Sequence, residues 1–495
     1  MSDAPDRMPV LVGVGVAAGP PDTADPASRP EAVDLMADAL RAAVDDAGAR
    51  SLLGATERIA VTLGSWGYRD PARLVADRVG ADAARTALIH VGIPQQTLVN
   101  DALRDIASGA LDVAVVVGGE AKLRDALARR AGVVASTAAE ADDAKPDEHR
   151  VPSTEIIAPA ELDVRLVVPV QQYALIENAL AHAEGQSQSE HLDDLAALWA
   201  SFNRVAQGNP SAAFPTPRDA AFLRTPSEEN RRLAFPYNKW HATQWTVDQA
   251  AALVLCSAAT ARAHGVPRDR WIFPHVGIES SLSLSLSRRT ELHRWPAMRV
   301  LGEAAARHVG RPLAEVEYAE LYSCFPAAVR VQQRELDLPN DKVPTITGGM
   351  AFAGGPLNNF VFQATAAMAQ RLRAEPGARG LVTTVSGLLT KPGLAIWSTE
   401  APPAGPLVDD FEAESRAATG EVESIAGYRG PATIATYTVI DGDDGPEKVA
   451  VIGDTPDGAR CVSVATDPEL AERGIRDDLI GLPVDVRGTE FSPVG

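Results

Sequence analysis

The sequence predicts an α/β protein built from two similar halves and followed by a small all-β domain. Over residues 1–400, short β-branched runs alternate with amphipathic segments of helical length, which is typical of an α/β sheet, mainly a parallel one. The runs LDVAVVVGG (111–119) and RGLVTTVSG (379–387) each follow a helix of similar length, which suggests two related halves. After residue 425, short strands at regular spacing and Asp-Gly turns replace this alternation.

The first half begins with VLVGVGVA (10–17), a continuous apolar run that predicts a buried strand. A helix is expected over 30–47, where apolar residues recur at helical spacing and Gly48 can end the helix. Further elements are expected at 58–64, 71–79, 86–92, 96–107, 111–119 and 247–256. We assign residues 1–120 and 236–270 to the N-terminal half. Residues 121–235, first rich in Ala, Asp, Glu and Pro and then helical, form a long excursion over the sheet.

The second half, residues 271–400, repeats the alternation. Elements are expected at 270–279, 296–308, 316–323, 326–335, 359–374, 379–387 and 393–400, with a glycine-rich loop at 347–358. A Pro-rich linker is expected at 401–425. Residues 426–495 then predict a small antiparallel β-barrel of the oligonucleotide-binding (OB-like) type, with hairpin turns at 441–445 and 454–458.

Charge and composition exclude several classes of function. The net charge is −20, and residues 401–495 hold 7 Lys and Arg against 19 Asp and Glu, so nucleic acid is not an expected partner. No apolar run approaches the roughly 20 residues of a membrane helix, and the polar N-terminus is not a secretory signal. The three cysteines have no metal or disulfide spacing, so we expect no metal and a cytoplasmic protein.

The nucleotide-binding motifs that the glycines suggest are incomplete. GVGVAAG (13–19) has the wrong spacing for a dinucleotide fold and runs into prolines instead of a helix. The loop TGGMAFAGGP (347–356) has glycines at P-loop spacing, but Gly355 and Pro356 stand where a P-loop has Lys and Ser or Thr. We therefore do not expect this loop to hold a phosphate.

Five segments, in order, carry a resemblance to a known family. They are VLVGVG (10–15), ASGALDVAVVVGGEA (107–121), VDQAAALVLCS (247–257), ELYSCFPAA (320–328) and TGGMAFAGGP (347–356). Over about residues 8–400 the chain resembles the thiolase superfamily, most closely the sterol-carrier-type thiolases and thiolase-like proteins. The resemblance implies a five-layered αβαβα fold, with 121–235 as a loop domain over the active site. It also implies acyl-coenzyme A as ligand and no bound cofactor.

The same resemblance shows which catalytic groups are missing. The nucleophilic cysteine would stand near Gly92, yet no cysteine precedes Cys256. Tyr322 replaces the residue that opens the family's HDCF or NEAF motif, Gly355 replaces the histidine of its GHP loop, and Ser386-Gly387 replaces its C-x-G cysteine. The resemblance thus places Gly92, Gly348, Gly349, Gly355, Ser386 and Gly387 at the substrate.

Three residues stay candidates for catalysis. Cys324 has a position at the catalytic cavity in HDCF-type relatives, but it can also be a small buried residue. Tyr322 can donate a proton to an acyl carbonyl, or it can be a core tyrosine with a satisfied hydroxyl. His241, where the chain returns to the sheet, can face the cavity or serve packing.

Two further sites follow the active-site loops. Lys391 can contact a phosphate or a carbonyl, or it can be solvated. At least one of Asn358 and Asn359 is expected to cap a helix.

Three functions remain open. The first is an acyl-coenzyme A-binding protein of lipid metabolism, which resembles acetyl-coenzyme A acetyltransferases but lacks thiolase activity. The second is a retro-aldolase acting on a 3-hydroxyacyl-coenzyme A, with Tyr322 as acid or base. The third is an interaction scaffold that binds a protein partner through its acidic C-terminal domain. The family usually dimerises through its core sheet, so a monomer or a homodimer is expected, depending on whether the added domain blocks that contact.

Overall fold

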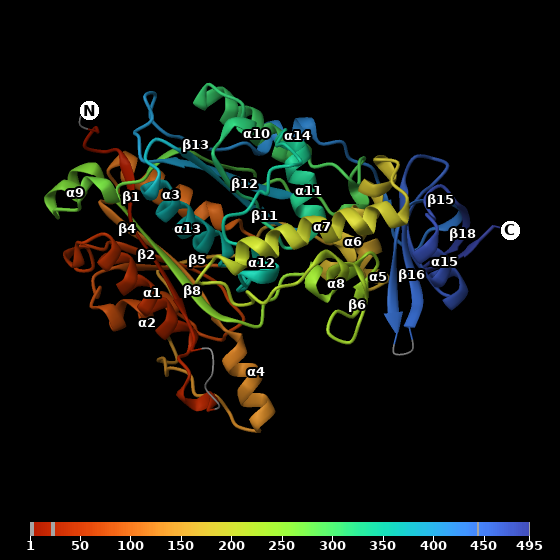
Figure 1. The fold of residues 1–495 in the computed structure, drawn as a ribbon, viewed down its shortest axis with the longest axis horizontal. Coiled ribbons are helices and arrows are strands. Elements are labelled where there is room, and N and C mark those ends of the chain that lie inside the picture. Colours follow the sequence, from red (N-terminus) through yellow and green to blue (C-terminus); the bar gives the residue numbers. More distant parts are fainter. Residues whose placement is uncertain (1–3, 21–24, 443–444, 495) are drawn as a thin grey trace.

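The computed structural model describes residues 4–20, 25–442 and 445–494, in which two β-sheets with helices between and around them form the core (Figure 1). The first sheet has the strand order β1-β8-β4-β2-β3-β5. Its strands are β1 (Pro9–Ala18), β2 (Arg58–Thr62), β3 (Arg85–Ile89), β4 (Val113–Ala121), β5 (Glu148–Arg150) and β8 (Asp248–Ser257). The second sheet has the order β10-β11-β12-β9-β13. Its strands are β9 (Phe273–Glu279), β10 (Tyr318–Glu320), β11 (Arg379–Ser386), β12 (Lys391–Ser398) and β13 (Leu407–Asp410).

Helices complete the five predicted layers. Helices α3 (Gln95–Ser108) and α13 (Phe360–Ala374) contact strands of both sheets and therefore lie between them. On the outer face of the first sheet lie α1 (Ala32–Asp46) and α2 (Pro71–Val79), and α10 (Pro296–Val309) covers the second sheet (Figure 1). The predicted αβαβα arrangement is thus confirmed.

The prediction of a mainly parallel sheet is confirmed, and each core sheet also contains one antiparallel strand. In the first, β8 lies between β1 and β4 and runs antiparallel to both, whereas β2, β3, β4 and β5 are parallel. In the second, β12 runs antiparallel to β11 and β9. A strand that is buried on both faces reads as the same continuous apolar run in either direction, so the sequence pattern does not reveal strand direction.

The segment 121–235 begins with α4 (Lys122–Ala131), which lies apart from the later helices and contacts β8 and residues 26–28 (Figure 1). It continues with α5 (Pro159–Asp163), α6 (Pro169–Ala183), α7 (Gln188–Gln207) and α8 (Ala220–Arg224), which form a helical layer between the core and the C-terminal domain (Figure 1). It also supplies β5, which pairs with β3 at the edge of the first sheet. The short strands β6 (Arg232–Ala234) and β7 (Tyr237–Asn238) follow as a separate pair. Helix α6 is buried over Gln172–Ala181, because α11 (Pro326–Glu335) packs against one side of it and the C-terminal domain against another.

The C-terminal domain is a six-stranded, mainly antiparallel sheet of order β14-β17-β16-β15-β18-β19. Its elements are β14 (Ser424–Ile425), β15 (Arg429–Gly442), β16 (Gly445–Asp454), β17 (Arg460–Thr466), α15 (Pro468–Arg476), β18 (Pro483–Arg487) and β19 (Glu490–Pro493). Because β17 also pairs with β19, five of the strands form a ring. A barrel of the OB-like type remains a prediction. The tip of the expected turn at 441–445, residues 443–444, lies outside the described residues.

The stretch 401–425 is more than a linker. Strand β13 pairs with β9 at the edge of the second core sheet, and α14 (Glu412–Ala418) contacts α10. The Pro-rich composition at 401–406 concealed this strand, whose four residues are too few for a clear alternating pattern.

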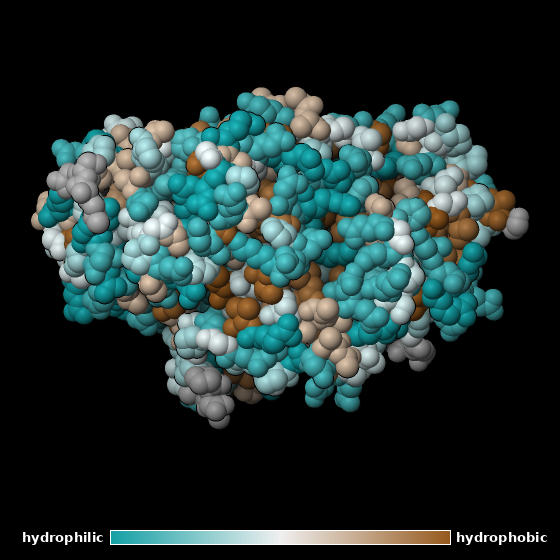
Figure 2. Space-filling view, turned by 45° about the horizontal axis from the view of Figure 1, so that its top comes forward, coloured by the Kyte–Doolittle hydropathy of each residue, from teal (hydrophilic) through white to brown (hydrophobic). Residues whose placement is uncertain are grey.

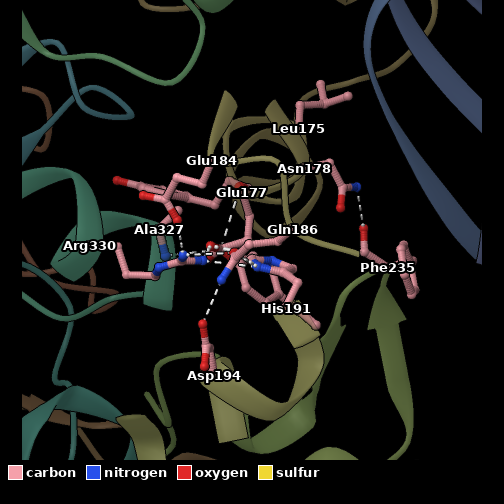
Figure 3. A network of polar contacts seen from close by, with 12 residues as sticks. Leu175, Glu177, Asn178, Glu184, Gln186, His191, Asp194, Phe235, Ala327 and Arg330 are labelled. Atoms are coloured by element: carbon pink, nitrogen blue, oxygen red, sulfur yellow. Dashed lines mark hydrogen bonds and ion pairs between the residues drawn. The ribbon is translucent and has the colours of Figure 1, made fainter. Parts of the chain in front are cut away.

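A buried network joins α6 to the core helix α11 (Figure 3). Arg330 Nη1 donates to Glu177 Oε1 at 2.8 Å, and the Tyr237 hydroxyl donates to Glu177 Oε2 at 2.6 Å. The Glu177 side chain is fully buried, and burial raises the pKa of its carboxyl group. Arg330 Nη1 also lies 3.0 Å from Nδ1 of His191, on α7. The network therefore fixes α6 and α7 against the helix that follows the YSCF motif.

The opposite side of α6 binds the C-terminal domain. Asn178 Nδ2 donates to the carbonyl oxygens of Phe235 and Tyr437, at 3.2 and 2.8 Å, and Thr436 Oγ1 donates to that of Leu175 at 2.6 Å. Helix α6 is therefore the element through which β15 meets the core.

Replacing Arg330 with methionine should destabilise the fold strongly. Glu177 would keep its buried position but lose its cationic partner, which typically costs about 3–5 kcal/mol. Arg334→Met on the same helix is the matched control, because Arg334 meets Glu184 at 3.6 Å and its side chain is 35% exposed. Its loss should cost about 1 kcal/mol or less. Denaturant unfolding measures both values, and equal losses would contradict the role given to the buried pair.

Candidate functional site

The glycine-rich loop is anchored by a buried carboxylate, Glu320, at the end of β10. Glu320 accepts the backbone N–H groups of Ile346 and Thr347, at 2.7 and 2.9 Å, and the hydroxyl groups of Thr345 and Thr347. Burial raises the pKa of Glu320 to about 7, although each of these hydrogen bonds favours the ionised form. The loop that begins at Gly348 is therefore held at its start by four contacts.

Gly348 and Gly349 let this loop approach α7 closely. Both have a positive φ, 96° and 71°. A Cβ at Gly348 would lie 2.4 Å from Ala206 Cβ, and one at Gly349 would lie 2.5 Å from Phe202 Cδ1. Any larger residue would clash with α7 at either position, so the two glycines serve backbone packing here.

Gly355, where the resemblance implies a histidine, has no room for a side chain. A Cβ at this position would lie 2.2 Å from Thr243 Cγ2. Thr243 is itself fixed, because its N–H and its hydroxyl both donate to the Cys324 carbonyl at 3.1 Å. The segment that returns from the helical layer thus fills the space of the missing side chain and links Gly355 to Cys324.

Cys324 is a poor nucleophile in this environment. It is 9% exposed, and burial raises the pKa of its thiol to about 12, so the thiol stays protonated at neutral pH. The hydroxyl of Tyr173, on α6, hydrogen-bonds to the thiol. The packing role that was the alternative for Cys324 agrees with this burial.

Tyr322 lies beside Cys324 but faces α3. Its side chain is partly buried, hydrogen-bonds to Gln95 and meets the ring of Phe360 edge-on at 6.1 Å. Burial raises the pKa of Tyr322 well above its usual value, so the hydroxyl group can donate a proton but does not ionise near neutral pH.

His241 is buried and neutral. Its exposed fraction is 1%, and burial lowers its pKa to about 4. Nδ1 accepts the backbone N–H of Asn238 at 3.1 Å, and the ring lies 6.1 Å from that of Tyr237. These contacts bury His241 against Tyr237 and Asn238, where the chain returns from the helical layer to the core. The structure gives it no contact with Tyr322.

Gly92 lies in the loop that precedes α3, beside Lys391. Lys391 Nζ donates to the Gly92 carbonyl at 2.9 Å, and the residue is only 4% exposed. A solvated Lys391 is therefore ruled out. The hairpin turn at Gly387 packs against Ile156, since a Cβ at Gly387 would lie 2.9 Å from Ile156 Cγ2. Ser386 and Gly387 thus belong to the Lys391 side of the site.

The expected cap by an asparagine is not made. Asn359 is the residue before α13, but its side chain makes no capping hydrogen bond. Asn358 instead adopts a left-handed φ of 56° and donates to the Leu63 carbonyl at 3.3 Å. Asparagine tolerates this conformation, so the backbone turn and not the helix end explains the residue.

Two cavities lie near the glycine loop and the helical layer. One, of about 230 Å³, is lined by β1, α13 and residues 209–211, and Gln249, Thr347 and Phe360 also border it. The other, of about 590 Å³, lies between the C-terminal part of α7 and residues 216–229. Neither is bordered by Tyr322, Cys324 or Gly355. In the described ranges, no helix is both long and apolar enough to cross a membrane, and no three potential metal ligands cluster.

Comparison with known proteins supports the resemblance. The family model for the additional C-terminal domain of type 1 thiolase-like proteins matches residues 415–490. The structure is similar to that of a monomeric SCP2-thiolase-like protein type 1 from Mycobacterium smegmatis, with 28% identity, a TM-score of 0.82, and coverage of 99% of this chain and 100% of that one. The chain thus has a thiolase-like fold with an additional C-terminal domain.

More distant structures share the fold of the thiolase-like core alone. The Ltp2–ChsH2(DUF35) aldolase has 17% identity and a TM-score of 0.59. The dimeric peroxisomal thiolase of Saccharomyces cerevisiae has 15% identity and a TM-score of 0.55. Each match covers 80% of this chain and 98% of the other chain. No protein with a curated description matches the sequence.

Two residues of the site could not be found from the sequence. Thr243 lies in a segment without periodicity, and nothing local indicates that its methyl group meets Gly355. Tyr173 lies on a helix that is buried on all sides over Gln172–Ala181, and its contact with Cys324 joins residues far apart in the chain. Both contacts depend on how the helical layer returns to the core.

The contact between Gly355 and Thr243 can be tested by a double-mutant cycle. Gly355→Ala should destabilise the protein by about 1–3 kcal/mol, because the added methyl group overlaps Thr243 Cγ2. Thr243→Ser removes that carbon and keeps the hydroxyl donor to Cys324, so it should recover much of the loss in the double variant. Thermal and denaturant unfolding give the values. Additive losses would show that Thr243 does not fill this space.

Proposed function

We propose that this protein binds coenzyme A esters and does not catalyse thiolase chemistry. The observation that carries the proposal is the filled space at Gly355. It is supported by the absence of a cysteine near Gly92 and by the protonated Cys324 thiol. Thiolase chemistry needs a thiolate nucleophile and a base beside it, and the loss of one such group removes most of the catalytic advantage.

The groove beside α7 suits the nucleotide end of coenzyme A. Its volume of about 590 Å³ lies within the usual range for ligand pockets, about 300–1,000 Å³. Arg204 and Arg218 line it, and the Arg218 guanidinium lies 3.5 Å from the centre of the Trp240 ring. Desolvation lowers the pKa of Arg218, which still remains cationic at neutral pH. Arginine suits phosphate groups because it can donate two parallel hydrogen bonds.

Calorimetric titration with acetyl-coenzyme A tests this proposal. We expect binding, and we expect Arg218→Ala to lower the affinity about 10- to 100-fold, the value of a hydrogen bond to a charged group. Arg307→Ala is the control, because that arginine is exposed and pairs within its own helix with Glu303. If Arg218→Ala leaves the affinity unchanged, acetyl-coenzyme A binds elsewhere on the protein. If acetyl-coenzyme A does not bind at all, the proposal fails and the interaction scaffold is the function that remains.

A retro-aldolase is the second candidate. Cleavage of a 3-hydroxyacyl-coenzyme A needs no acyl-enzyme, only an acid or base and a site for the carbonyl oxygen. Tyr322 is the candidate proton donor, since it is partly exposed and retains its proton. Similarity in fold to the aldolase supports this alternative, although it extends to the fold alone.

Release of an aldehyde or ketone from 3-hydroxyacyl-coenzyme A distinguishes this candidate. A retro-aldolase that uses Tyr322 should lose about 100-fold or more of its rate in Tyr322→Phe, as expected for a general acid or base. Tyr318→Phe is the control, because Tyr318 lies on the same strand segment and contacts Arg371 at the surface. Equal rates in the two variants would exclude Tyr322 from the reaction.

The proposal extends to assembly and location. A monomer in the cytoplasm is proposed, since the similar protein from M. smegmatis is monomeric. The edge strand next to β3 is β5, which has only three residues, and such a short edge strand offers a second copy little to pair with. The acidic C-terminal domain is proposed to bind a basic protein partner, because residues 401–495 carry a net charge of −12. Hydrophilic residues cover much of the face shown in Figure 2.

A further inference from the structure

Lys391 is a buried amine that no part of the proposed function uses. It begins β12, and its one polar contact among the described residues is the hydrogen bond from Nζ to the Gly92 carbonyl. Burial lowers the pKa of its ammonium group, while the more distant Glu412 opposes that change. A cation with only a neutral carbonyl as partner is destabilised relative to the neutral amine. The uncharged amine, which is the nucleophilic form, therefore makes up a larger fraction here than at an exposed lysine.

The amine lies close to the surface in spite of its burial. Val91, which precedes its hydrogen-bond partner, is 47% exposed. Gly92, Ser386 and Gly387 around it are each partly exposed. A small reagent can therefore reach the amine by a local movement of the turn that follows β11.

That turn has an unusual backbone. Gly387, Leu388 and Leu389 have successive φ values of 64°, 62° and 59°. Leucine rarely adopts this left-handed conformation, and such residues persist where the surroundings hold them. Here Arg289 Nη2 donates to the Leu388 carbonyl at 2.6 Å, and Thr390 Oγ1 accepts the N–H of Leu284 at 2.7 Å. Arg289, Leu284 and Ile156 therefore hold the turn, while Ser386 at its start remains partly exposed.

Ser386 faces the same space as Lys391. The two residues are directly paired across β11 and β12, so their side chains lie on the same face of the sheet, with Cβ atoms roughly 5 Å apart. No hydrogen bond occupies the Ser386 hydroxyl group within the described part of the chain. A carbonyl group placed between the two side chains would meet a nucleophilic nitrogen and a hydrogen-bond donor.

We propose that Lys391 is an acylation site that accepts acyl groups from thioesters, with Ser386 as donor to the thioester carbonyl oxygen. The neutral amine attacks the carbonyl carbon, a C–N bond forms, and the C–S bond breaks. The thiolate leaves and takes the proton that the nitrogen gives up, so that an amide and a free thiol result. The amide keeps one N–H group, which can still donate to Gly92, and the buried charge is lost.

The chain offers internal controls for this inference. It has six lysines, and Lys145 is exposed and part of no regular element. The protein is incubated with S-acetyl-N-acetylcysteamine, a thioester without a nucleotide, and peptide mass spectrometry follows each lysine. We expect Lys391 to be acetylated severalfold faster than Lys145. As pH rises, the acetylation rate of Lys391 should reach its plateau at a lower pH than that of Lys145. Ser386→Ala should slow the acetylation of Lys391 severalfold and leave the acetylation rate of Lys145 unchanged.

The outcomes separate this inference from the proposed function, on which it does not rest. A Lys391 that reacts no faster than Lys145 overturns it, even if acetyl-coenzyme A binds in the calorimeter. Preferential acetylation of Lys391 supports it, even if no binding is seen. Lys391→Arg should abolish the signal from that peptide and leave acetylation of Lys145 intact, which assigns the signal to Lys391.

Discussion

The buried ion pair between Glu177 and Arg330 is the interaction on which the rest of the structure depends. It fixes α6, whose other side carries β15 and with it the C-terminal domain. Arg330 also contacts His191, near the beginning of α7, and the far end of that helix packs against Gly348 and Gly349. The C-terminal domain therefore packs directly against α6. The buried ion pair in turn holds α6 against α11.

With the helical layer fixed in this way, the glycines of the loop determine how closely neighbouring segments approach the candidate site. Gly348 and Gly349 allow α7 to pack closely against the loop, and at Gly355 the side chain of Thr243, in the segment that returns from the helical layer, fills the space that a histidine would need. What remains on the Tyr322 side is a tyrosine and a protonated thiol. At the turn after β11, the Lys391 amine lies beside Ser386 and donates to the Gly92 carbonyl.

Much of this arrangement could be predicted from the sequence. The helix at 71–79 and the strand at 379–387 follow from local periodicity and their terminal residues, and the structure places them at Pro71–Val79 and Arg379–Ser386. The direction of β8, the pairing of β13 and the contact of Thr243 with Gly355 could not be predicted. Each depends on tertiary packing between segments far apart in the chain. Lys391 shows the same limit, because its flanking sequence gives no sign that it is buried.

The central claim is that the site cannot carry out acyl transfer between coenzyme A esters. The most direct test is thiolytic cleavage of acetoacetyl-coenzyme A by free coenzyme A, followed by the loss of substrate at saturating concentrations of both. We expect the rate of thiolytic cleavage to equal the rate measured without protein. A rate that rises in proportion to protein concentration and reaches thiolase-like turnover would contradict it.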